Sequence, residues 1–179
     1  MATKKSYPLS KVYQLIEPGR VVMISTQDKD KANVMTMTWL TMIDFMPPQI
    51  GCVVGQQSLT HKIIKKTKEC VINLPTADML ETVVGVGNST GSKIDKFAHF
   101  KLTQGTSSNV KAPRVDECYA NLECKVIDAT KAKTYNFFIF EVVKAWVSTT
   151  KKKPAFLHHR GEGTFFLEGK EIKTKSKMK

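Results

Sequence analysis

The chain has 179 residues, of which 41% are hydrophobic and 25% are charged, and it carries a formal net charge of +12. This balance is typical of a globular protein; no apolar run approaches the roughly 20 residues that span a bilayer, and the charged N-terminus lacks the apolar segment of a secretory signal. We therefore expect a cytoplasmic protein that has no contact with a membrane.

The excess of basic residues does not by itself indicate a nucleic-acid partner. The lysines gather at residues 62–68, 151–153 and 170–179, and only three arginines occur. Arginine is the side chain that most often contacts bases and duplex phosphates. The composition therefore favours a solvated basic surface, and a nucleic-acid-binding barrel is a lesser alternative.

Several segments rich in β-branched and apolar residues predict strands. In chain order they are residues 21–26, 34–41, 50–54, 70–74, 119–129, 134–147 and 164–167. The first two are expected to form an antiparallel hairpin, and a bend at 128–133 joins the two long strands. The third strand is expected to begin after Pro47 and Pro48, because a proline has no N–H to donate to a neighbouring strand in the middle of a sheet.

Helices are predicted only in the connections, over residues 10–16, 58–67 and 76–84. Ser58 and Thr76 can cap the last two, and Gly85 and Gly87 are expected to end the third. No GxGxxG motif follows a strand. The sequence thus predicts a single domain over 1–179, with a core at about 10–170 and a basic tail at 170–179. Its fold class is mainly β, an antiparallel barrel with inserted helices.

The segment at 33–39 (NVMTMTW) carries the most informative pattern. In a strand its threonines lie on one face, and its methionines and tryptophan lie on the other. A polar row beside a soft aromatic row suits a flat amphiphilic ligand that bears a phosphate. The alternative is a half-buried strand whose apolar side chains fill the core. The candidate ligand-binding residues are Asn33, Met35, Thr36, Met37, Thr38 and Trp39.

Two other segments could hold a phosphate. Ser58 and Thr60 open a helix whose free N–H groups and positive dipole end attract anions, although capping explains these residues equally well. Lys93 and Lys96 could reach an anion from the polar loop at 88–93 and its end. That loop lacks the residue order of a Walker A motif, so a solvated loop is the alternative.

No catalytic or metal-binding set of side chains stands out. The cysteines form no CxxC motif, so buried reduced thiols are expected at Cys52, Cys70, Cys118 and Cys124. His158 and His159 are adjacent and point opposite ways in an extended segment. No Ser–His–Asp or paired-carboxylate arrangement is evident. We expect neither a catalytic side chain nor a metal, so a cofactor must supply any chemistry.

The order of these segments resembles the flavin-reductase-like, FMN-binding split-barrel family, and within it the flavoredoxins. The matching segments are residues 21–26, 33–39, 47–53, 58–60 and 69–75, with a weaker match at 91–97. The resemblance implies a six-stranded Greek-key split barrel that forms a homodimer, with one FMN per subunit near the interface. It also implies that the strand at 33–39 lies along the flavin, and that Ser58 and Thr60 bind its phosphate.

The resemblance gives roles to five further residues. Ser92, Lys93 and Lys96 would close over the cofactor from their loop. Cys52 would lie near the isoalloxazine ring. His159 resembles the histidine that precedes a glycine near the end of many family members.

The chain departs from the family in three places. Many members have Arg or Lys two residues before the phosphate-site threonine, where this chain has Ser58. The phosphate charge would then fall to Lys93, Lys96 or a lysine of the second subunit. The usual glycine before Asn33 is missing, and residues 158–161 are a loose version of the late histidine–glycine signature.

These features imply a flavoprotein oxidoreductase in which FMN takes up electrons and passes them on. One version keeps FMN bound and exchanges electrons with a redox protein, as an electron carrier. The other is an NAD(P)H-dependent flavin reductase, with FMN as substrate or carrier. The absence of an obvious nicotinamide motif favours the first. A barrel that binds no ligand and serves only in interactions is a further alternative.

Overall fold

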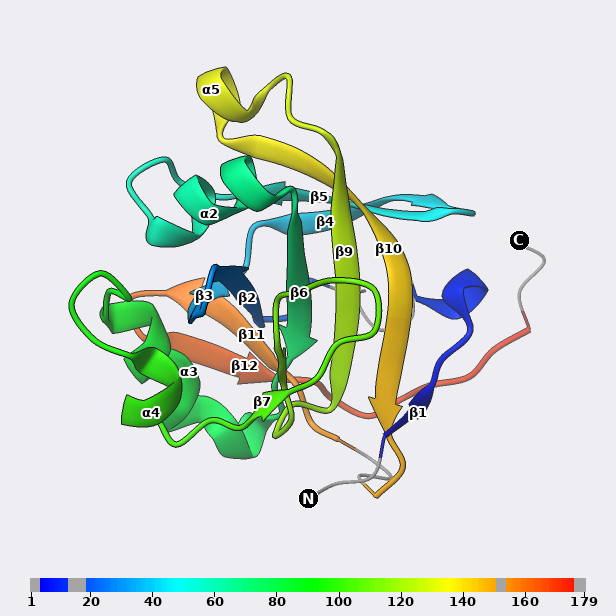
Figure 1. Ribbon diagram of the computed structural model, residues 1–179. Helices are drawn as coiled ribbons and strands as arrows, with labels where there is room; N and C mark the ends of the chain where they lie inside the picture. Colours follow the sequence, from blue (N-terminus) through cyan, green and yellow to red (C-terminus); the bar gives the residue numbers. More distant parts are fainter. Residues whose placement is uncertain (1–3, 13–18, 151–153, 176–179) are drawn as a thin grey trace.

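The computed structural model describes residues 4–12, 19–150 and 154–175, most of which belong to one curled antiparallel sheet (Figure 1). Seven strands of this eight-stranded sheet follow the order β3-β2-β6-β9-β10-β5-β4. The eighth strand, β1, also pairs with β10. The strands of the sheet are β1 (Lys4–Ser6), β2 (Val22–Asp28), β3 (Lys31–Met37), β4 (Leu40–Phe45), β5 (Pro48–Val53), β6 (Glu69–Leu74), β9 (Ala120–Asp128) and β10 (Phe137–Ser148).

Helices and two small hairpins occupy the connections. The helices are η1 (Leu9–Lys11), α2 (Leu59–Thr67), η2 (Ala77–Met79), α3 (Leu80–Asn88), α4 (Lys96–His99) and α5 (Ala132–Tyr135). The hairpins are β7 (Gln104–Gly105) with β8 (Arg114–Val115), and β11 (Leu157–Gly161) with β12 (Thr164–Leu167). In Figure 1, α2 lies on one side of β3, and α3 and α4 lie on the opposite side. The third strand therefore runs between two helical layers.

The sheet closes into a barrel that is open along one seam. Its edge strands β3 and β4 are joined only by Thr38 and Trp39, so the two edges must meet at this corner. There the carbonyl of Trp39 accepts a hydrogen bond from the N–H of Val53 in β5, at 3.0 Å. The strands β3-β2-β6-β9-β10-β5 form the predicted six-stranded barrel, to which β1 and β4 are added. The predicted mainly β fold is confirmed.

Two apolar clusters lie on the two faces of β2. Val22 and Ile24 point into the barrel with residues of the other strands, and Val21 and Met23 point to a second cluster with Val83 of α3. Burial of each such side chain stabilises the fold by about 1.5–3 kcal/mol. Because both faces are covered, this strand has a continuous apolar sequence instead of an alternating one.

The four cysteines are free and buried, as predicted. Cys70 and Cys124 lie directly opposite each other on β6 and β9. Burial raises the pKa of the Cys52 and Cys70 thiols well above the ordinary value. Protonated thiols are poor nucleophiles, so these groups serve as small apolar core side chains.

The predicted strand at 34–41 is wrong in its bounds, because the chain turns the open corner of the barrel at Thr38 and Trp39 and continues as a separate strand. The bend predicted at 128–133 contains part of the short helix α5, which also replaces the expected start of the last long strand. The predicted helix at 10–16 has one turn of 3₁₀ helix at Leu9–Lys11, and its remainder falls largely outside the described residues.

The predicted helix at 76–84 is also wrong in its bounds. Gly85 and Gly87 lie inside α3, which continues to Asn88. A Cβ on Gly85 would lie 2.5 Å from the ring of Phe100, and one on Gly87 would lie 3.4 Å from Cβ of Thr36. These glycines therefore allow close packing of the helix instead of ending it.

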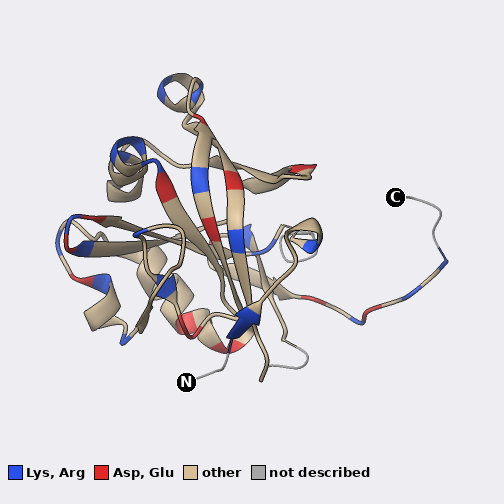
Figure 2. Ribbon diagram, turned by 45° about the vertical axis from the view of Figure 1, so that its right-hand side comes forward, with Lys and Arg blue, Asp and Glu red and all other residues tan. Residues whose placement is uncertain are grey.

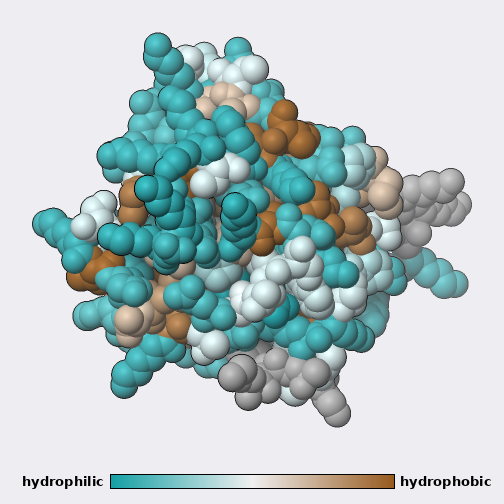
Figure 3. Space-filling view, viewed as in Figure 1, coloured by the Kyte–Doolittle hydropathy of each residue, from teal (hydrophilic) through white to brown (hydrophobic). Residues whose placement is uncertain are grey.

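Charge and apolar surface are distributed unevenly. Figure 2 shows lysines along the outer side of α2 and near the β2–β3 turn. The face in Figure 3 is mostly hydrophilic, with small separate apolar areas. Large exposed apolar side chains lie on β4 and at its two ends: Trp39, Ile43, Phe45 and Met46. Among the described residues, no helix is long and apolar enough to cross a membrane.

Candidate functional site

A cavity of about 240 Å³ lies where β3 passes between the start of α2 and the end of α3. The strand supplies one wall, the helix start the second, and the loop after α3 together with α4 the third. The lining residues are Asn33, Met35, Thr36, Gln57, Ser58, Leu59, Thr60, Val86, Gly87, Ser89, Thr90, Gly91 and Lys96.

The start of α2 gives the cavity an end that attracts anions. Ser58 is the N-cap, and its Oγ accepts from the N–H of His61 at 3.0 Å and donates to the carbonyl of Gly55 at 2.8 Å. The first turn carries no acidic residue. The remaining free N–H groups of this turn and the helix dipole therefore favour a negatively charged ligand.

Asn33 presents an unsatisfied oxygen at the cavity wall. Its Nδ2 donates to Oγ1 of Thr60 at 2.8 Å, which holds the β3 side chain against the helix start. Its Oδ1 is buried and has no hydrogen-bond partner among the described residues. A Cβ on Gly91 would overlap this oxygen, so any larger residue would have to displace the Asn33 side chain from Thr60. A buried acceptor without a donor costs about 1–3 kcal/mol, and a ligand hydroxyl could remove that cost.

Thr36 already has a protein partner. Its hydroxyl donates to the carbonyl of Val83 in α3 at 2.6 Å. The threonine therefore ties the strand to the helix, and only its oxygen lone pair is left for a ligand. Its neighbours Met35 and Met37 pack against the barrel core, and Met35 also lines the cavity.

Lys96 brings a positive charge to the cavity from α4. Its side chain is buried, and Nζ donates to the carbonyl of Val86 at 2.8 Å. Burial lowers the pKa of Lys96 to about 8. It is the one cationic side chain among the described residues that line the cavity, and none of those residues is a carboxylate. A bound anion would restore the pKa of the amine toward its ordinary value.

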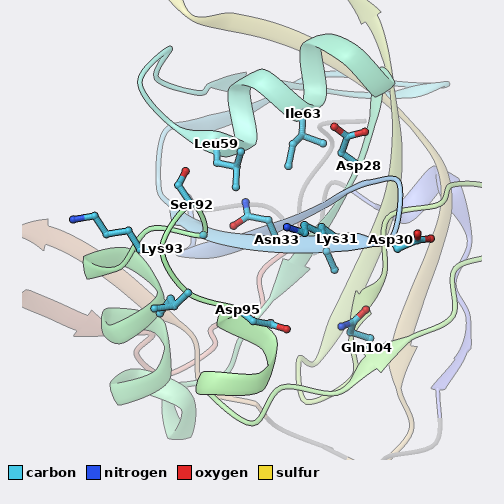
Figure 4. A pocket seen from close by; sticks show the side chains of 13 residues that line it. Asp28, Asp30, Lys31, Asn33, Leu59, Ile63, Ser92, Lys93, Asp95 and Gln104 are labelled. Carbon is cyan, nitrogen blue, oxygen red and sulfur yellow. The ribbon is translucent and has the colours of Figure 1, made fainter.

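The structure brings six of the predicted site residues to this cavity: Asn33, Met35, Thr36, Ser58, Thr60 and Lys96. Ser92 and Lys93 line a larger cavity of about 430 Å³ next to it, shown in Figure 4. The sequence did not indicate Gln57, Gly87 and Gly91 as site residues. Gly91 could have been predicted from its place in a polar loop, because glycine allows another group to approach the backbone closely.

Five predicted residues do not line either cavity. Met37 is buried in the barrel core, and Cys52 is fully buried there near Cys124. Thr38 and Trp39 follow the end of β3, and the indole is 71% exposed. His159 packs on Phe165 of its own hairpin, with ring centroids 4.9 Å apart.

The arrangement can bind an anionic organic molecule but contains no acid–base pair of its own. Among the described residues, no group of three or more histidine, cysteine or acidic side chains could hold a metal ion. The polar groups of the cavity are hydroxyls, amides and one buried amine. Their chemistry is that of positioning and charge compensation, so a redox or group-transfer reaction at this site depends on a bound cofactor.

Comparison with known proteins identifies the architecture. Residues 16–164 match the model of the flavin reductase like domain family. A protein of Archaeoglobus fulgidus, described only as uncharacterized, is 34% identical over 137 residues, which are 75% of this chain and 77% of that protein.

Two solved structures share the fold over nearly the whole chain. The first is an FMN-binding domain of a flavin reductases-like enzyme from Shewanella baltica, with TM-score 0.90 and 25% identity over 97% of this chain and 98% of that one. The second is a flavoredoxin from Methanosarcina acetivorans, with TM-score 0.77 and 25% identity over 90% and 91% of the chains. These findings confirm the resemblance expected from the sequence and the split-barrel fold. The chain belongs to the flavin reductase-like domain family.

Proposed function

We propose that the protein binds FMN at the 240 Å³ cavity and works as a flavin-dependent oxidoreductase of the flavoredoxin type. One observation carries the proposal: a helix start, a buried lysine and a buried oxygen without a donor converge on one cavity that no carboxylate lines. The relatives described as FMN-binding and as flavoredoxin support the choice of ligand.

The residues present fit FMN group by group. The free N–H groups of α2, the hydroxyls of Ser58 and Thr60, and the amine of Lys96 suit a phosphate. The ribityl chain offers hydroxyl donors, which Oδ1 of Asn33 lacks. FMN would supply the electron-accepting chemistry when bound. The chain's own residues hold its phosphate, orient its sugar chain and exclude water from one side.

The cavity is too small for the whole cofactor. Small-molecule sites commonly enclose about 300–1,000 Å³, and this one encloses about 240 Å³. We place the phosphate and the ribityl chain inside, and the ring outside along Thr38 and Trp39. The exposed indole then has an aromatic partner, so Thr38 and Trp39 serve the flavin although they do not line the cavity.

A ring held in this way needs a cover, and a second copy of the chain can supply it. Trp39 is an exposed apolar side chain at the open corner of the barrel, and Ile43, Phe45 and Met46 continue this exposed apolar surface along β4 to the tip of the β4–β5 hairpin. Such a concentration of exposed apolar groups marks an association surface. We therefore propose a homodimer with each flavin near the interface. The four free buried thiols suit the cytoplasm.

Two modes of action fit this site. In the first, FMN stays bound and exchanges electrons with a redox protein, which the exposed lysines of α2 would attract if it is acidic. In the second, NADH or NADPH reduces the flavin, as the name of the family suggests. Both predict a yellow protein or one that takes up FMN. They differ in whether a nicotinamide nucleotide reduces the bound flavin.

Titration with FMN tests the proposal. We expect quenching of FMN fluorescence at a ratio of one flavin per chain, together with a rise in the melting temperature. Mixing the FMN-loaded protein with NADH or NADPH without oxygen then separates the modes, because rapid loss of the oxidised flavin absorbance supports the reductase. Unquenched fluorescence and an unchanged melting temperature at saturating FMN would refute the binding proposal.

A further inference from the structure

The outer sides of α2 and α5 together form a surface that carries only positive charge. Residues 54–68 and 129–136, which contain these helices and the turns next to them, include no Asp or Glu. Figure 2 shows the lysines of both helices on the outside of the molecule. All the lysines of the two segments are exposed. We call them the basic face: Lys62, Lys65, Lys66, Lys68, Lys131 and Lys133.

Hydrogen bonds hold α5 beside the start of α2. Nε2 of Gln56 donates to the carbonyl of Lys133 at 2.6 Å, and the N–H of Gln56 donates to Oδ1 of Asn136 at 3.1 Å. The N–H of Val54 donates to the carbonyl of Asn136 at 2.8 Å. The lysines of the two helices therefore belong to one fixed surface, although they lie far apart in the sequence.

Most of this charge has no partner within the chain. Lys66 pairs with Asp28 at the end of β2, at 2.7 Å. The other five lysines of the basic face form no ion pair with any described residue. Lys62 also lies one helical turn from Lys65 and Lys66, and like charges at this spacing destabilise a helix. The helix thus retains these lysines at a cost to its own stability.

Elsewhere on the barrel a lysine is compensated. Lys125 lies on β9 directly opposite Glu69 of β6 and directly opposite Glu141 of β10. Opposite charges at facing positions of neighbouring strands stabilise a sheet. The lack of acidic residues is therefore a local feature of the basic face, and not only a result of the net charge of +12.

The basic face adjoins the corner where we place the flavin ring. The N–H of Val53 donates to the carbonyl of Trp39 at this corner, and the next residues lead to Ser58 at the flavin cavity. In Figure 1 the tip of the β4–β5 hairpin, which carries part of the proposed contact between two chains, lies on the opposite side of the molecule from α2 and α5. Association through that hairpin therefore leaves the basic face open.

The composition of the basic face fits a protein partner better than a nucleic acid. Its two segments contain no arginine, the side chain that most often binds bases and phosphates. They carry one exposed aromatic side chain, Tyr135, instead of the several on which single-stranded bases stack. Weak electron-transfer complexes bury less than about 1,200 Å². One aromatic group with a charged rim suits an interface of that size.

We propose that the basic face docks an acidic protein that carries a one-electron redox centre and exchanges electrons with the flavin. This inference rests on the proposed flavin function and names the partner of its first mode. The lysines accelerate the encounter and orient the partner, and the small apolar contact lets the complex dissociate quickly. Two reduced partners are oxidised in turn, and their two electrons together with two protons from water reduce one flavin.

Calorimetric titration with an acidic plant-type [2Fe–2S] ferredoxin tests the docking, both with and without FMN. We expect the affinity to fall at least about tenfold between low and physiological ionic strength, because salt screens exposed charges. Lys62→Glu/Lys65→Glu/Lys133→Glu should weaken binding at low ionic strength at least about tenfold. These three side chains are exposed, so the variant should unfold at the wild-type temperature.

The matched control is Lys11→Glu/Lys170→Glu/Lys173→Glu. It makes the same change in net charge at exposed lysines of η1 and of the segment after β12, which lie away from α2 and α5 in Figure 1. Its affinity for ferredoxin should remain close to that of the wild type. Loss of affinity in the first variant alone assigns the docking to the basic face instead of to the total charge.

Electron transfer provides a second readout. Reduced ferredoxin is mixed with FMN-saturated protein without oxygen, and the loss of oxidised flavin absorbance is followed. The rate constant at low ionic strength should fall at least about tenfold in Lys62→Glu/Lys65→Glu/Lys133→Glu. At high ionic strength the variant and the wild type should converge, since screened charges no longer steer the encounter. Damage to the flavin site would instead persist at high ionic strength.

The proposal is overturned if ferredoxin does not bind the wild type at low ionic strength, or if the two triple variants weaken binding equally. It is also overturned if a single-stranded oligonucleotide binds more tightly than ferredoxin and loses its affinity in the first variant, because the basic face would then bind nucleic acid. Ferredoxin binding without FMN binding would contradict the proposed flavin function and leave the docking face standing. FMN binding without ferredoxin binding would do the reverse.

Discussion

Gly91 and Asn33 meet at the boundary of the two cavities, and their contact fixes the loop against β3. A Cβ on Gly91 would overlap Oδ1 of Asn33 and come within 3.3 Å of Leu59. Overpacking of this kind commonly costs about 1–3 kcal/mol. We expect Gly91→Ala to lower the free energy of unfolding by that amount and to weaken FMN binding, measured by denaturant unfolding and fluorescence titration.

Gly169→Ala is the matched control, because a Cβ there meets nothing within 4 Å and the residue lines neither cavity. It should leave both quantities within error of the wild type. If Gly91→Ala also leaves FMN affinity unchanged, the loop does not close over the ligand as proposed.

Lys96 predicts how FMN binding depends on pH. Its pKa is about 8 in the free protein because burial disfavours the charged amine. A phosphate stabilises the charged form, so binding must take up a proton above pH 8. The dissociation constant of FMN should therefore rise with pH above 8, by up to about tenfold per pH unit.

The same group changes stability with the opposite sign. An unfolded lysine keeps its ordinary pKa of 10.5, so between pH 8 and 10.5 the unfolded chain binds a proton that the native chain lacks. Stability contributed by this group should thus increase over that interval. Lys96→Gln should abolish the pH dependence of FMN binding and remove this group's share of the rise in stability, whereas Lys4, whose pKa burial also lowers to about 8, should keep its own share. Riboflavin, which lacks the phosphate, should bind wild type without the pH dependence, and an equal dependence for riboflavin would exclude the lysine–phosphate contact.

The candidate site shows what local pattern can and cannot predict for single residues. The sequence predicts the strand that carries Asn33 and the capped helix that carries Thr60. The hydrogen bond between the two side chains follows from the packing of this helix against the strand. Strand alternation predicts which residues share a face with Cys52. It does not predict that this face is the one enclosed in the barrel core, because that depends on how the sheet closes. Trp39 is exposed because β3 ends before it, at the open seam of the barrel. No sequence pattern near Trp39 indicates where that seam lies.

At the level of elements, α2 is the helix whose predicted N-cap residue also lines the cavity. Ser58 caps the helix and lines the cavity. We expect Ser58→Ala to lower the free energy of unfolding by about 1 kcal/mol, since this is typical of a lost N-cap. FMN should bind more weakly, because the hydroxyl and the geometry of the helix start are both altered.

Thr41→Ala serves as the control for this variant. The hydroxyl of Thr41 is exposed and, among the described residues, bonds only the adjacent carbonyl of Met42, at 3.3 Å. Its loss should change neither unfolding nor binding by a measurable amount. A stability loss in Ser58→Ala without any change in FMN affinity would show that the residue only caps the helix.

The elements with strong local signals were predicted, and those defined by tertiary contacts were not. β2, β6 and α2 have continuous apolar runs or a clear cap and were placed within two residues. The end of α3 was misplaced because Gly85 and Gly87 act through contacts with Phe100 and Thr36, which lie elsewhere in the sequence. The three-residue β1 depends on tertiary contacts, namely its pairing with β10 and the hydrogen bonds from Nζ of Lys4 to Val115 and Asn121, and its own sequence carries no strand signal.

At the level of the whole molecule, a buried carboxylate fastens the long loop between α4 and β9 to the sheet. Glu123 is fully buried and accepts from the N–H groups of Ser108 and Asn109, at 2.9 and 2.6 Å, and from Nε1 of Trp146 at 2.7 Å. Glu123→Gln places an amide donor against these donors. We expect a loss of at least about 1–3 kcal/mol in the free energy of unfolding.

Hydrogen exchange can locate the effect of Glu123→Gln. Faster exchange should be confined to residues 106–113 and their contacts, while the barrel strands keep their protection. Glu141→Gln, a half-buried position on β10 without a side-chain hydrogen bond to any described residue, is the control. Uniformly faster exchange would mean that the carboxylate stabilises the barrel as a whole instead of the loop.

The association of two chains is the prediction on which the complete flavin site depends. Phe45 and Met46 are 52% and 64% exposed at the tip of the β4–β5 hairpin, at the end of β4 that lies away from the corner where the flavin ring is proposed to lie. We expect the wild type to have twice the 20.1 kDa mass of one chain in sedimentation equilibrium. Phe45→Asp/Met46→Asp should be monomeric, because charges on an apolar interface oppose association.

The monomeric variant should still bind FMN, but more weakly, since the phosphate cavity lies within one chain and only the cover of the ring is lost. Ile127→Asp places one aspartate on an exposed apolar position at the end of β9 and should remain dimeric. A wild type that is monomeric while binding FMN at full strength would show that one chain completes the site alone. The exposed side chains of β4 would then require a different partner.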